Sequence, residues 1–261
     1  MLIAAIAFCF GLIFGSFLNV CIARLPKDES LLWPASRCPK CLAPIRFYDN
    51  IPLVSFILLG GRCRSCREPI SLKYPLIELL TGILTALFAV KWLGNPGWLA
   101  VSLLAVYALI VVSAVDFETM MISDLFPLIL FGLGLAGSYL NPNFQGGWIV
   151  RLGQAVLGAA VGAGFIWGLA FLGKAIYKKD AVGEGDIFLM GAIGSLCGWQ
   201  GVVSGVIIAS FFGSVYGISL LLMKRAERMS HMPFGPFLAL GALINLYALV
   251  KPECFFFVLP F

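Results

Sequence analysis

Two aspartates at the ends of apolar segments are the residues of this sequence best suited to catalysis. Asp116 closes the apolar run that ends in Ser113-Ala114-Val115, and Asp186 follows the turn Gly183-Glu184-Gly185 and opens another apolar run. Ionisable residues at such places in a membrane are costly and usually functional. If the two segments pack side by side, the carboxyls can share a proton, so that one activates a water while the other polarises a carbonyl. The pattern therefore predicts aspartic protease chemistry, with Asp116 and Asp186 as the catalytic pair.

A structural role is the alternative for each aspartate. Asp186 could cap a helix N-terminus, where the helix dipole favours a carboxylate, and Asp116 could mark the boundary between membrane and water. We interpret the neighbouring acids as solvated loop residues: Glu118, Asp124, Asp180 and Glu184. The sequence has one histidine, His231, and no HExxH pattern. A zinc-protease helix is thereby excluded, and a Ser-His-Asp triad is disfavoured.

Four cysteines in two CxxC pairs predict a closed metal site. Cys38 and Cys41 form the first pair, and Cys63 and Cys66 form the second after 21 intervening residues. Four thiolates satisfy tetrahedral Zn²⁺ and leave no open position, so we expect a structural zinc ion. Two disulfides or a redox pair are the alternative. A cytoplasmic location, argued below, disfavours lasting disulfides.

The composition excludes a water-soluble globular protein. Hydrophobic residues make up 61% of the 261 residues and charged residues 12%, and the mean hydropathy is +0.98. We expect an all-α polytopic membrane protein with about eight transmembrane helices and a small zinc-stapled segment after the first, because each span needs about 20 apolar residues. The predicted spans are 1–23, 74–90, 98–115, 125–140, 152–173, 187–197, 201–223 and 234–250. The spans 187–197 and 201–223 come from one uncharged run, which we divide at Gly198-Trp199-Gln200-Gly201.

The basic residues predict which loops face the cytoplasm. With the N-terminus outside, 15 of the 18 Lys and Arg residues fall on the cytoplasmic side, which follows the positive-inside rule. The net charge of +5 is thus a topological signal, and we expect no nucleic-acid partner. The predicted organisation is a first helix at 1–23, a cytoplasmic zinc-binding segment at 24–73 and a helical protease core at 74–261. Both aspartates would lie at a shallow, water-accessible cytoplasmic edge.

Ordered motifs along almost the whole chain resemble the type IV prepilin peptidases, a family of GxGD aspartic proteases with leader peptidase and N-methyltransferase activity. Besides both cysteine pairs, the matching motifs are Gly15 to Val20 with Arg24-Leu25-Pro26, Asp49 to Pro52 with Ser55, Gly61-Arg62-Cys63, Pro69-Ile70-Ser71, Tyr74-Pro75 with Glu78, Asp116, Gly183 to Asp186, and Pro233 to Pro236. The family's catalytic aspartates match Asp116 and Asp186. One departure is Ser123, which stands after Ile122 where the family usually has proline.

The resemblance implies a substrate and a second reaction. Such an enzyme, in the bacterial inner membrane, would cleave the basic leader of prepilins or pseudopilins on the cytoplasmic face, after a glycine. It would then methylate the new N-terminal amine with S-adenosylmethionine. No strand followed by a glycine-rich turn occurs in the soluble segment, so a Rossmann-type cofactor site is not expected. Polar groups near the cysteine unit are candidates for a cofactor site or, equally, for boundary anchors: Asn19, Arg24 and Glu78.

Two other functions fit parts of this sequence. A proton-coupled transporter would use Asp116 and Asp186 as a proton relay across the lipid bilayer. A non-enzymatic membrane scaffold would use the zinc segment to dock a cytoplasmic partner and the aspartates as helix caps. Two observations distinguish these functions from the peptidase. One is the separation of the two carboxyls in a structure, and the other is whether the protein cleaves a prepilin.

Overall fold

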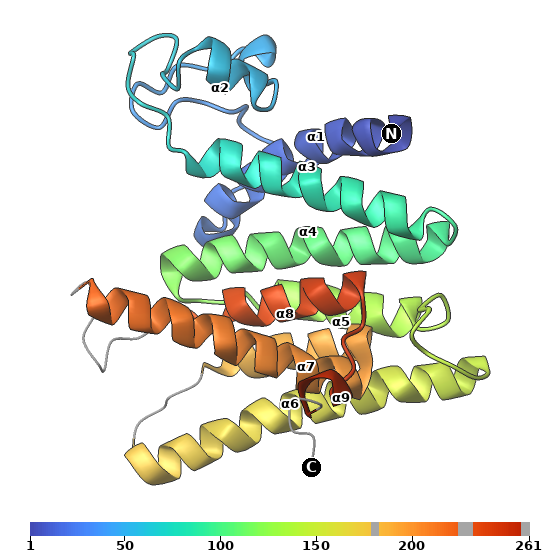
Figure 1. Cartoon of the computed structure of the whole chain (residues 1–261). Helices are drawn as coiled ribbons and strands as arrows, with labels where there is room; N and C mark the ends of the chain where they lie inside the picture. The colour runs from blue at the N-terminus through green and yellow to red at the C-terminus, as the bar shows by residue number, and fades with distance from the viewer. Residues whose placement is uncertain (179–182, 224–231, 257–261) are drawn as a thin grey trace. The chain divides into compact units, whose positions relative to one another are not determined.

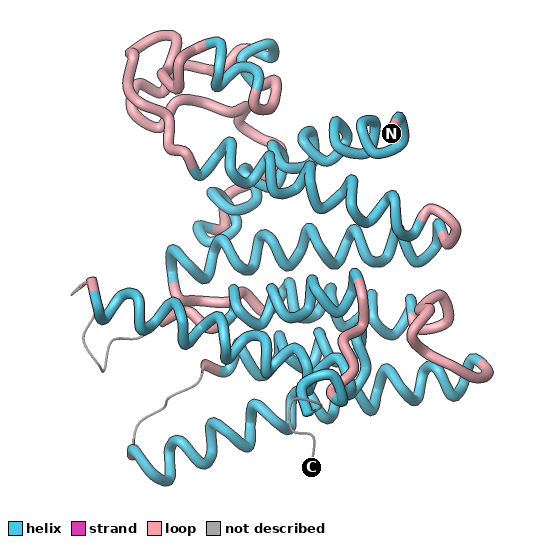
Figure 2. Tube along the Cα trace, in the orientation of Figure 1, coloured by secondary structure: helices cyan, strands magenta, loops and turns pink. Residues whose placement is uncertain are grey.

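The computed structural model describes residues 1–178, 183–223 and 232–256, and within them it is helical, with two isolated bridges and no strand. Figures 1 and 2 show the helices and the loops that join them. Asp180 and His231, which were considered above, lie outside the described residues. The predicted all-α class is confirmed.

The chain divides into two compact units between Gly94 and Asn95. In the first unit two long helices pack along each other and a loop-rich segment of about 50 residues joins them. The helices of this unit are α1 (Leu2–Arg24), α2 (Val54–Leu58) and α3 (Lys73–Trp92). The joining segment otherwise contains only 3₁₀ turns and irregular loops, because its prolines interrupt regular structure.

The second unit is built around α7, which packs against α5, α6 and α8, while α8 also packs against α4. The helices of this unit are α4 (Pro96–Thr119), α5 (Leu125–Gly137), α6 (Trp148–Tyr177), α7 (Glu184–Leu222), α8 (Gly235–Tyr247) and α9 (Glu253–Phe256). Both candidate aspartates belong to this unit. The first unit carries the four cysteines.

Five of the described helices are long and apolar enough to cross a membrane: α1, α3, α4, α6 and α7. Helices α5 and α8 are apolar but have only 13 residues each. The structure supports a polytopic membrane protein, but it does not confirm the count of eight spans.

The 39-residue helix α7 is interrupted at Gly198, where φ is +70° and ψ is 175°. This conformation suits glycine, which has no Cβ to collide with the backbone. A straight helix would separate Asp186 from Tyr216 by about 45 Å, at ~1.5 Å per residue. Contacts described below bring both ends of α7 to the end of α4, so the chain folds back at Gly198. The predicted break within the uncharged run is confirmed.

Small residues allow the helices to approach closely at four glycines. A Cβ atom added to Gly11 or Gly15 would collide with α3, at 2.5 Å from a threonine oxygen and 2.7 Å from a backbone carbon. A Cβ added to Gly158 or Gly162 would collide with backbone carbonyl groups of α7. Dispersion contacts drive helix association in lipid, so these close contacts stabilise both helix pairs.

Candidate active site and metal site

Asp116 lies in the last turn of α4 and is almost completely buried, with 4% of its surface exposed. The helix ends at Met120, whose left-handed conformation (φ +53°) closes the last turn through a bond from its N–H to the Asp116 carbonyl. The Asp116 carboxylate accepts a hydrogen bond from the backbone N–H of Gly235, 3.0 Å from Oδ2. Gly235 is the first residue of α8, so the start of α8 fixes the orientation of this carboxylate.

Ile122 lies between two glycines that come from α7 and α8. A Cβ added to Gly185 would lie 2.9 Å from Ile122 Cβ, and a Cβ added to Gly235 would lie 3.1 Å from Ile122 Cδ1 and 2.7 Å from Asp116 Oδ2. Only glycine fits at either place without a shift of its neighbours. The turn after α4 therefore holds Ile122 against both helix starts although Ser123 replaces the usual proline.

Asp186 lies in the first turn of α7, whose N-cap residue is Gly183 and has no side-chain cap hydrogen bond. Asp186 is therefore not the N-cap residue, but its carboxyl accepts a hydrogen bond from the Gly183 backbone in the first turn, where the helix dipole also favours a carboxylate. Its Oδ1 atom is buried and has no hydrogen-bond partner, and the preceding Gly185 is packed against Ile122, which also contacts Gly235 beside Asp116. A buried carboxylate oxygen without a partner is costly, so it is available to bind a water or a substrate.

The far end of α7 reaches the same place. The ring of Phe117, which follows Asp116, lies 6.1 Å from the ring of Tyr216 and 6.3 Å from the ring of Phe237, in edge-on arrangements. Aromatic pairs in this geometry stabilise by about 0.5–1.5 kcal/mol beyond area burial. The end of α4 is therefore enclosed by both ends of α7 and by the start of α8.

The four predicted metal-binding cysteines are brought together. Their Sγ atoms all lie within 4.8 Å of one another, and those of Cys38 and Cys66 are 3.9 Å apart. A tetrahedral zinc site with Zn–S bonds of ~2.3 Å separates its sulfurs by about 3.8 Å. Disulfide sulfurs would be ~2.05 Å apart, and all four cysteines are free. The donor set and its spacing fit a metal such as Zn²⁺.

The two cysteine loops are copies of one another, with the pattern R-C-x-x-C-x-x-P-I at 37–45 and 62–70. In each loop the N–H of the first cysteine donates to the carbonyl five residues later, 2.9 Å away. In each loop the first arginine also forms an isolated bridge with the proline. The residue after the second cysteine is left-handed in both, with φ +59° at Leu42 and +62° at Arg67. Each loop thus turns back sharply and presents two sulfurs to the other loop.

The pKa values of Cys38 and Cys66, one thiol from each loop, are shifted in opposite directions. The backbone amides of Cys41 and Lys40 lower the pKa of Cys38 to about 7. Although the backbone amide of Glu68 favours a thiolate at Cys66, desolvation and hydrogen bonds to the other thiols raise the pKa of Cys66 to about 12. Four thiolates so close repel one another, and a divalent cation would remove that repulsion.

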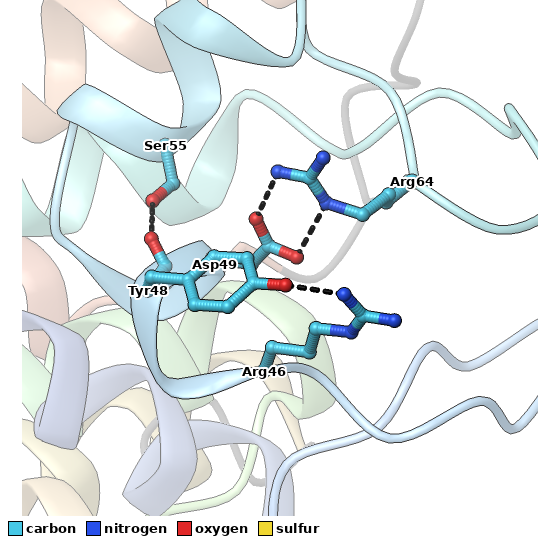
Figure 3. A network of polar contacts seen from close by, with 5 residues as sticks. All are labelled: Arg46, Tyr48, Asp49, Ser55 and Arg64. Carbon is cyan, nitrogen blue, oxygen red and sulfur yellow. Dashed lines mark hydrogen bonds and ion pairs between the residues drawn. The ribbon is translucent and has the colours of Figure 1, made fainter.

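A polar network ties the second cysteine loop to the 3₁₀ turn at 47–50 (Figure 3). Arg64 donates two hydrogen bonds to the Asp49 carboxylate, at 2.8 and 2.6 Å, and they hold the pKa of Asp49 below its usual range. Arg46 donates to the Tyr48 hydroxyl, and the Ser55 hydroxyl donates to the Tyr48 carbonyl over 2.8 Å. A bidentate Arg–carboxylate pair fixes geometry better than a single contact, so this network orients the metal loop.

The other polar candidates make contacts that join helices to loops. Asn19 donates to a backbone carbonyl at the start of α3, over 3.0 Å. Glu78 accepts the Leu53 N–H at 2.9 Å. Arg24 donates to two carbonyls of the loop after α1, at 2.7 and 2.6 Å. Of these three side chains, only Asn19 has a buried polar atom, Oδ1, that lacks a hydrogen-bond partner. They are anchoring contacts and do not form a cradle for S-adenosylmethionine, whose site stays a prediction.

Sequence comparisons match the two parts of the chain separately. Residues 9–92 match the bacterial peptidase A24 N-terminal domain, and residues 103–218 match the type IV leader peptidase family. Among curated relatives, a protein of Aeromonas salmonicida is 36% identical over 93% of this chain and 89% of its own length. Proteins of Pseudomonas aeruginosa and Neisseria gonorrhoeae are 34% and 38% identical, each over 90% of this chain and over 87% and 86% of their own lengths. All three are named prepilin leader peptidase/N-methyltransferase. No solved structure gives a significant match.

Proposed function

Because the chain belongs to the type IV leader peptidase family, we propose that it removes the leader of type IV prepilins or pseudopilins with Asp116 and Asp186 and then methylates the new N-terminus. The observation that carries the aspartate mechanism is the meeting of three helix ends around Asp116. The end of α4 brings the carboxylate, the start of α8 donates an N–H to it, and the start of α7 brings Asp186.

The two carboxyls have complementary roles in this mechanism. With one proton shared between them, the ionised carboxylate takes a proton from water as the water attacks the scissile carbonyl. The protonated carboxyl donates to the carbonyl oxygen, and the tetrahedral intermediate collapses when the departing amine is protonated. The Gly235 N–H occupies one oxygen of Asp116 and prevents rotation of the carboxyl. The unpartnered Oδ1 of Asp186 is the atom best placed to bind the attacking water.

Charge supports an orientation in which the aspartates face the cytoplasm. The segment 24–73 is strongly basic, which favours its retention on the cytoplasmic side of the inner membrane. The end of α4 and the turn after it, from Asp116 to Asp124, hold three acids and no base, and this stretch would attract the basic leader of a prepilin. An apolar substrate helix in the bilayer would then present its boundary peptide bond at the level of the carboxylates.

The metal and the methyl donor have different places in this proposal. A structural zinc ion on the four cysteines would hold the two loops of the segment 37–70 together, since the segment has little apolar core of its own. N-methylation rests on the names of the relatives, and S-adenosylmethionine supplies the methyl group. No residue is assigned to its binding.

Purified protein incubated with a type IV prepilin and S-adenosylmethionine should yield a pilin that lacks its leader and is heavier by one methyl group. Mass spectrometry of the products reads both reactions at once. Omission of S-adenosylmethionine should leave cleavage intact and remove only the methyl group. An intact prepilin after incubation with folded protein would contradict the peptidase proposal, and an unmethylated product would contradict the second reaction.

A Gly235→Ala substitution should lower kcat for cleavage about tenfold and leave KM nearly unchanged, because small displacements of catalytic groups are costly. The added methyl would lie 2.7 Å from Asp116 Oδ2, so the carboxylate must turn or α8 must shift. Steady-state cleavage of a labelled prepilin measures both constants. Gly132→Ala is the matched control, because no atom lies within 4 Å of its added Cβ. Unchanged kcat in Gly235→Ala would mean that this contact does not position Asp116.

A further inference from the structure

A pocket of about 270 Å³ lies between α7 and the start of α8. Three small residues of α7 line one side, and the chain that leads into α8 lines the other. The residues that line it are Ser210, Gly213, Ser214, Met232, Pro233, Phe234 and Phe237. The pocket is not part of the carboxylate pair described above.

The aromatic wall of this pocket is continuous with the surroundings of Asp116. Phe234 immediately precedes Gly235, whose N–H binds the Asp116 carboxylate. The Phe237 ring lies 5.5 Å from the ring of Tyr216 and 6.3 Å from the ring of Phe117, the neighbour of Asp116. A side chain in the pocket would therefore belong to a residue close to the bond that is cleaved at the carboxylates.

The chemistry of the walls selects a large apolar side chain. A Cβ added to Gly213 would lie 3.5 Å from the Phe237 ring, so the absent side chain leaves a slot in front of that ring. Phenylalanine rings and a methionine thioether form favourable contacts with aromatic and long aliphatic groups. Ser210 and Ser214 are exposed on the surface of α7, so the slot opens to the outside of the helix bundle. A substrate that lies in the bilayer can reach it from there.

We propose that this pocket binds the large apolar side chain of the residue that follows the cleaved bond, and so contributes to the choice of cleavage position. The inference rests on the proposed peptidase function. The side of the bond follows from polarity: the basic leader fits the acidic stretch from Asp116 to Asp124, and the apolar part of the substrate fits the apolar pocket. The pocket residues act on binding and register, and no proton moves through them.

Filling the slot tests this assignment. Gly213→Leu would place a side chain against Phe237, and two prepilins that differ only in Phe or Ala after the cleaved bond provide the comparison. We expect kcat/KM for the Phe substrate to fall about tenfold or more, equal to about 1.4 kcal/mol. For the Ala substrate we expect a change of about twofold or less. Ser210→Leu, one turn earlier on the same face, should give the same pattern and serves if Gly213→Leu does not fold.

Gly164→Leu on α6 is the matched control, since no atom lies within 4 Å of its added Cβ. Its kcat/KM should equal that of the unchanged protein for both substrates. Equal losses on both substrates in Gly213→Leu and Ser210→Leu, or no loss on either, would overturn the pocket assignment. Those outcomes leave the peptidase proposal standing, because the unchanged protein still cleaves both prepilins. Failure of the unchanged protein to cleave either one would instead overturn the proposed function.

Discussion

Asp186→Asn and Asp116→Asn should each lower the rate of prepilin cleavage by about 10³-fold or more. Asparagine has nearly the shape of aspartate but neither accepts nor supplies the proton that the reaction moves. General acid–base groups typically contribute ~10²–10⁴-fold, and two groups that act as a unit fail together. The rate of appearance of the leaderless pilin, measured with each variant in the same detergent or liposomes, reads the effect.

Asp28→Asn is the matched control for both substitutions. Asp28 is exposed in the loop after α1 and has a left-handed backbone (φ +54°) that asparagine also adopts, so its variant should cleave within about twofold of the unchanged protein. Methylation of a pilin that already lacks its leader should persist in both aspartate variants if they remain folded. Cleavage at an undiminished rate by either variant would remove the two-aspartate mechanism. A proton-coupled transporter would then be the better account of the pair.

Cys38→Ser and Cys63→Ser should each release about one zinc ion per chain and unfold the loops around 37–70. Structural zinc sites contribute ~10–16 kcal/mol of binding free energy that is also folding free energy, and loss of one thiolate opens the tetrahedral site. Metal content by mass spectrometry and limited proteolysis of the segment measure the two effects. The unchanged protein treated with a chelator should show the same new cleavage sites.

Cys9→Ser and Cys254→Ser are the matched controls for the metal site. Both cysteines are exposed and lie outside the cluster, so their variants should retain the zinc and the protease resistance of the segment. A protein in which Cys38→Ser and Cys63→Ser are combined and which still holds one metal per chain would contradict the site. Loss of the zinc with no change in proteolysis would contradict its structural role.

The candidate site residues could be proposed from the sequence because each stands in a short, specific pattern. The CxxC spacing fixes how two sulfurs can meet, and the structure indeed gathers all four. The repeat of nine residues around those pairs was also visible in the sequence, but only its backbone hydrogen bonds show that both copies make the same turn. Such local patterns can be recognised in a sequence because a few neighbouring residues determine their geometry.

The role of Gly235 could not be derived in the same way. It lies 119 residues after Asp116, and its hydrogen bond exists only because α8 packs against α4. The motif Pro233 to Pro236 marked this part of the sequence as a match to the family, but it did not predict the hydrogen bond from Gly235 to Asp116. A glycine next to a proline at the start of a helix, with the N–H left free, is a weak signal that a partner comes from elsewhere.

The number of membrane spans was equally hard to predict. Apolarity alone locates the run 187–223 but cannot decide whether an interruption ends a helix, bends it or reverses it. Gly198 reverses it, and that outcome depends on the contacts of α7 with α6 and α8. For 125–140 the helix stops at Gly137, three residues before the predicted end. Helix ends depend on capping and packing, which hydropathy does not contain.

The reversal at Gly198 also bears on how the protein enters the membrane during its synthesis. Residues 187 to 223 contain no charged residue, and the turn between the two arms is only Gly198-Trp199-Gln200-Gly201. Charged side chains are what make a segment expensive to move into lipid. The two arms can therefore be inserted together as one helical hairpin, with no hydrophilic loop to transfer to the other side. A Gln200→Lys substitution should hinder insertion of this hairpin into the membrane more than it destabilises the folded protein.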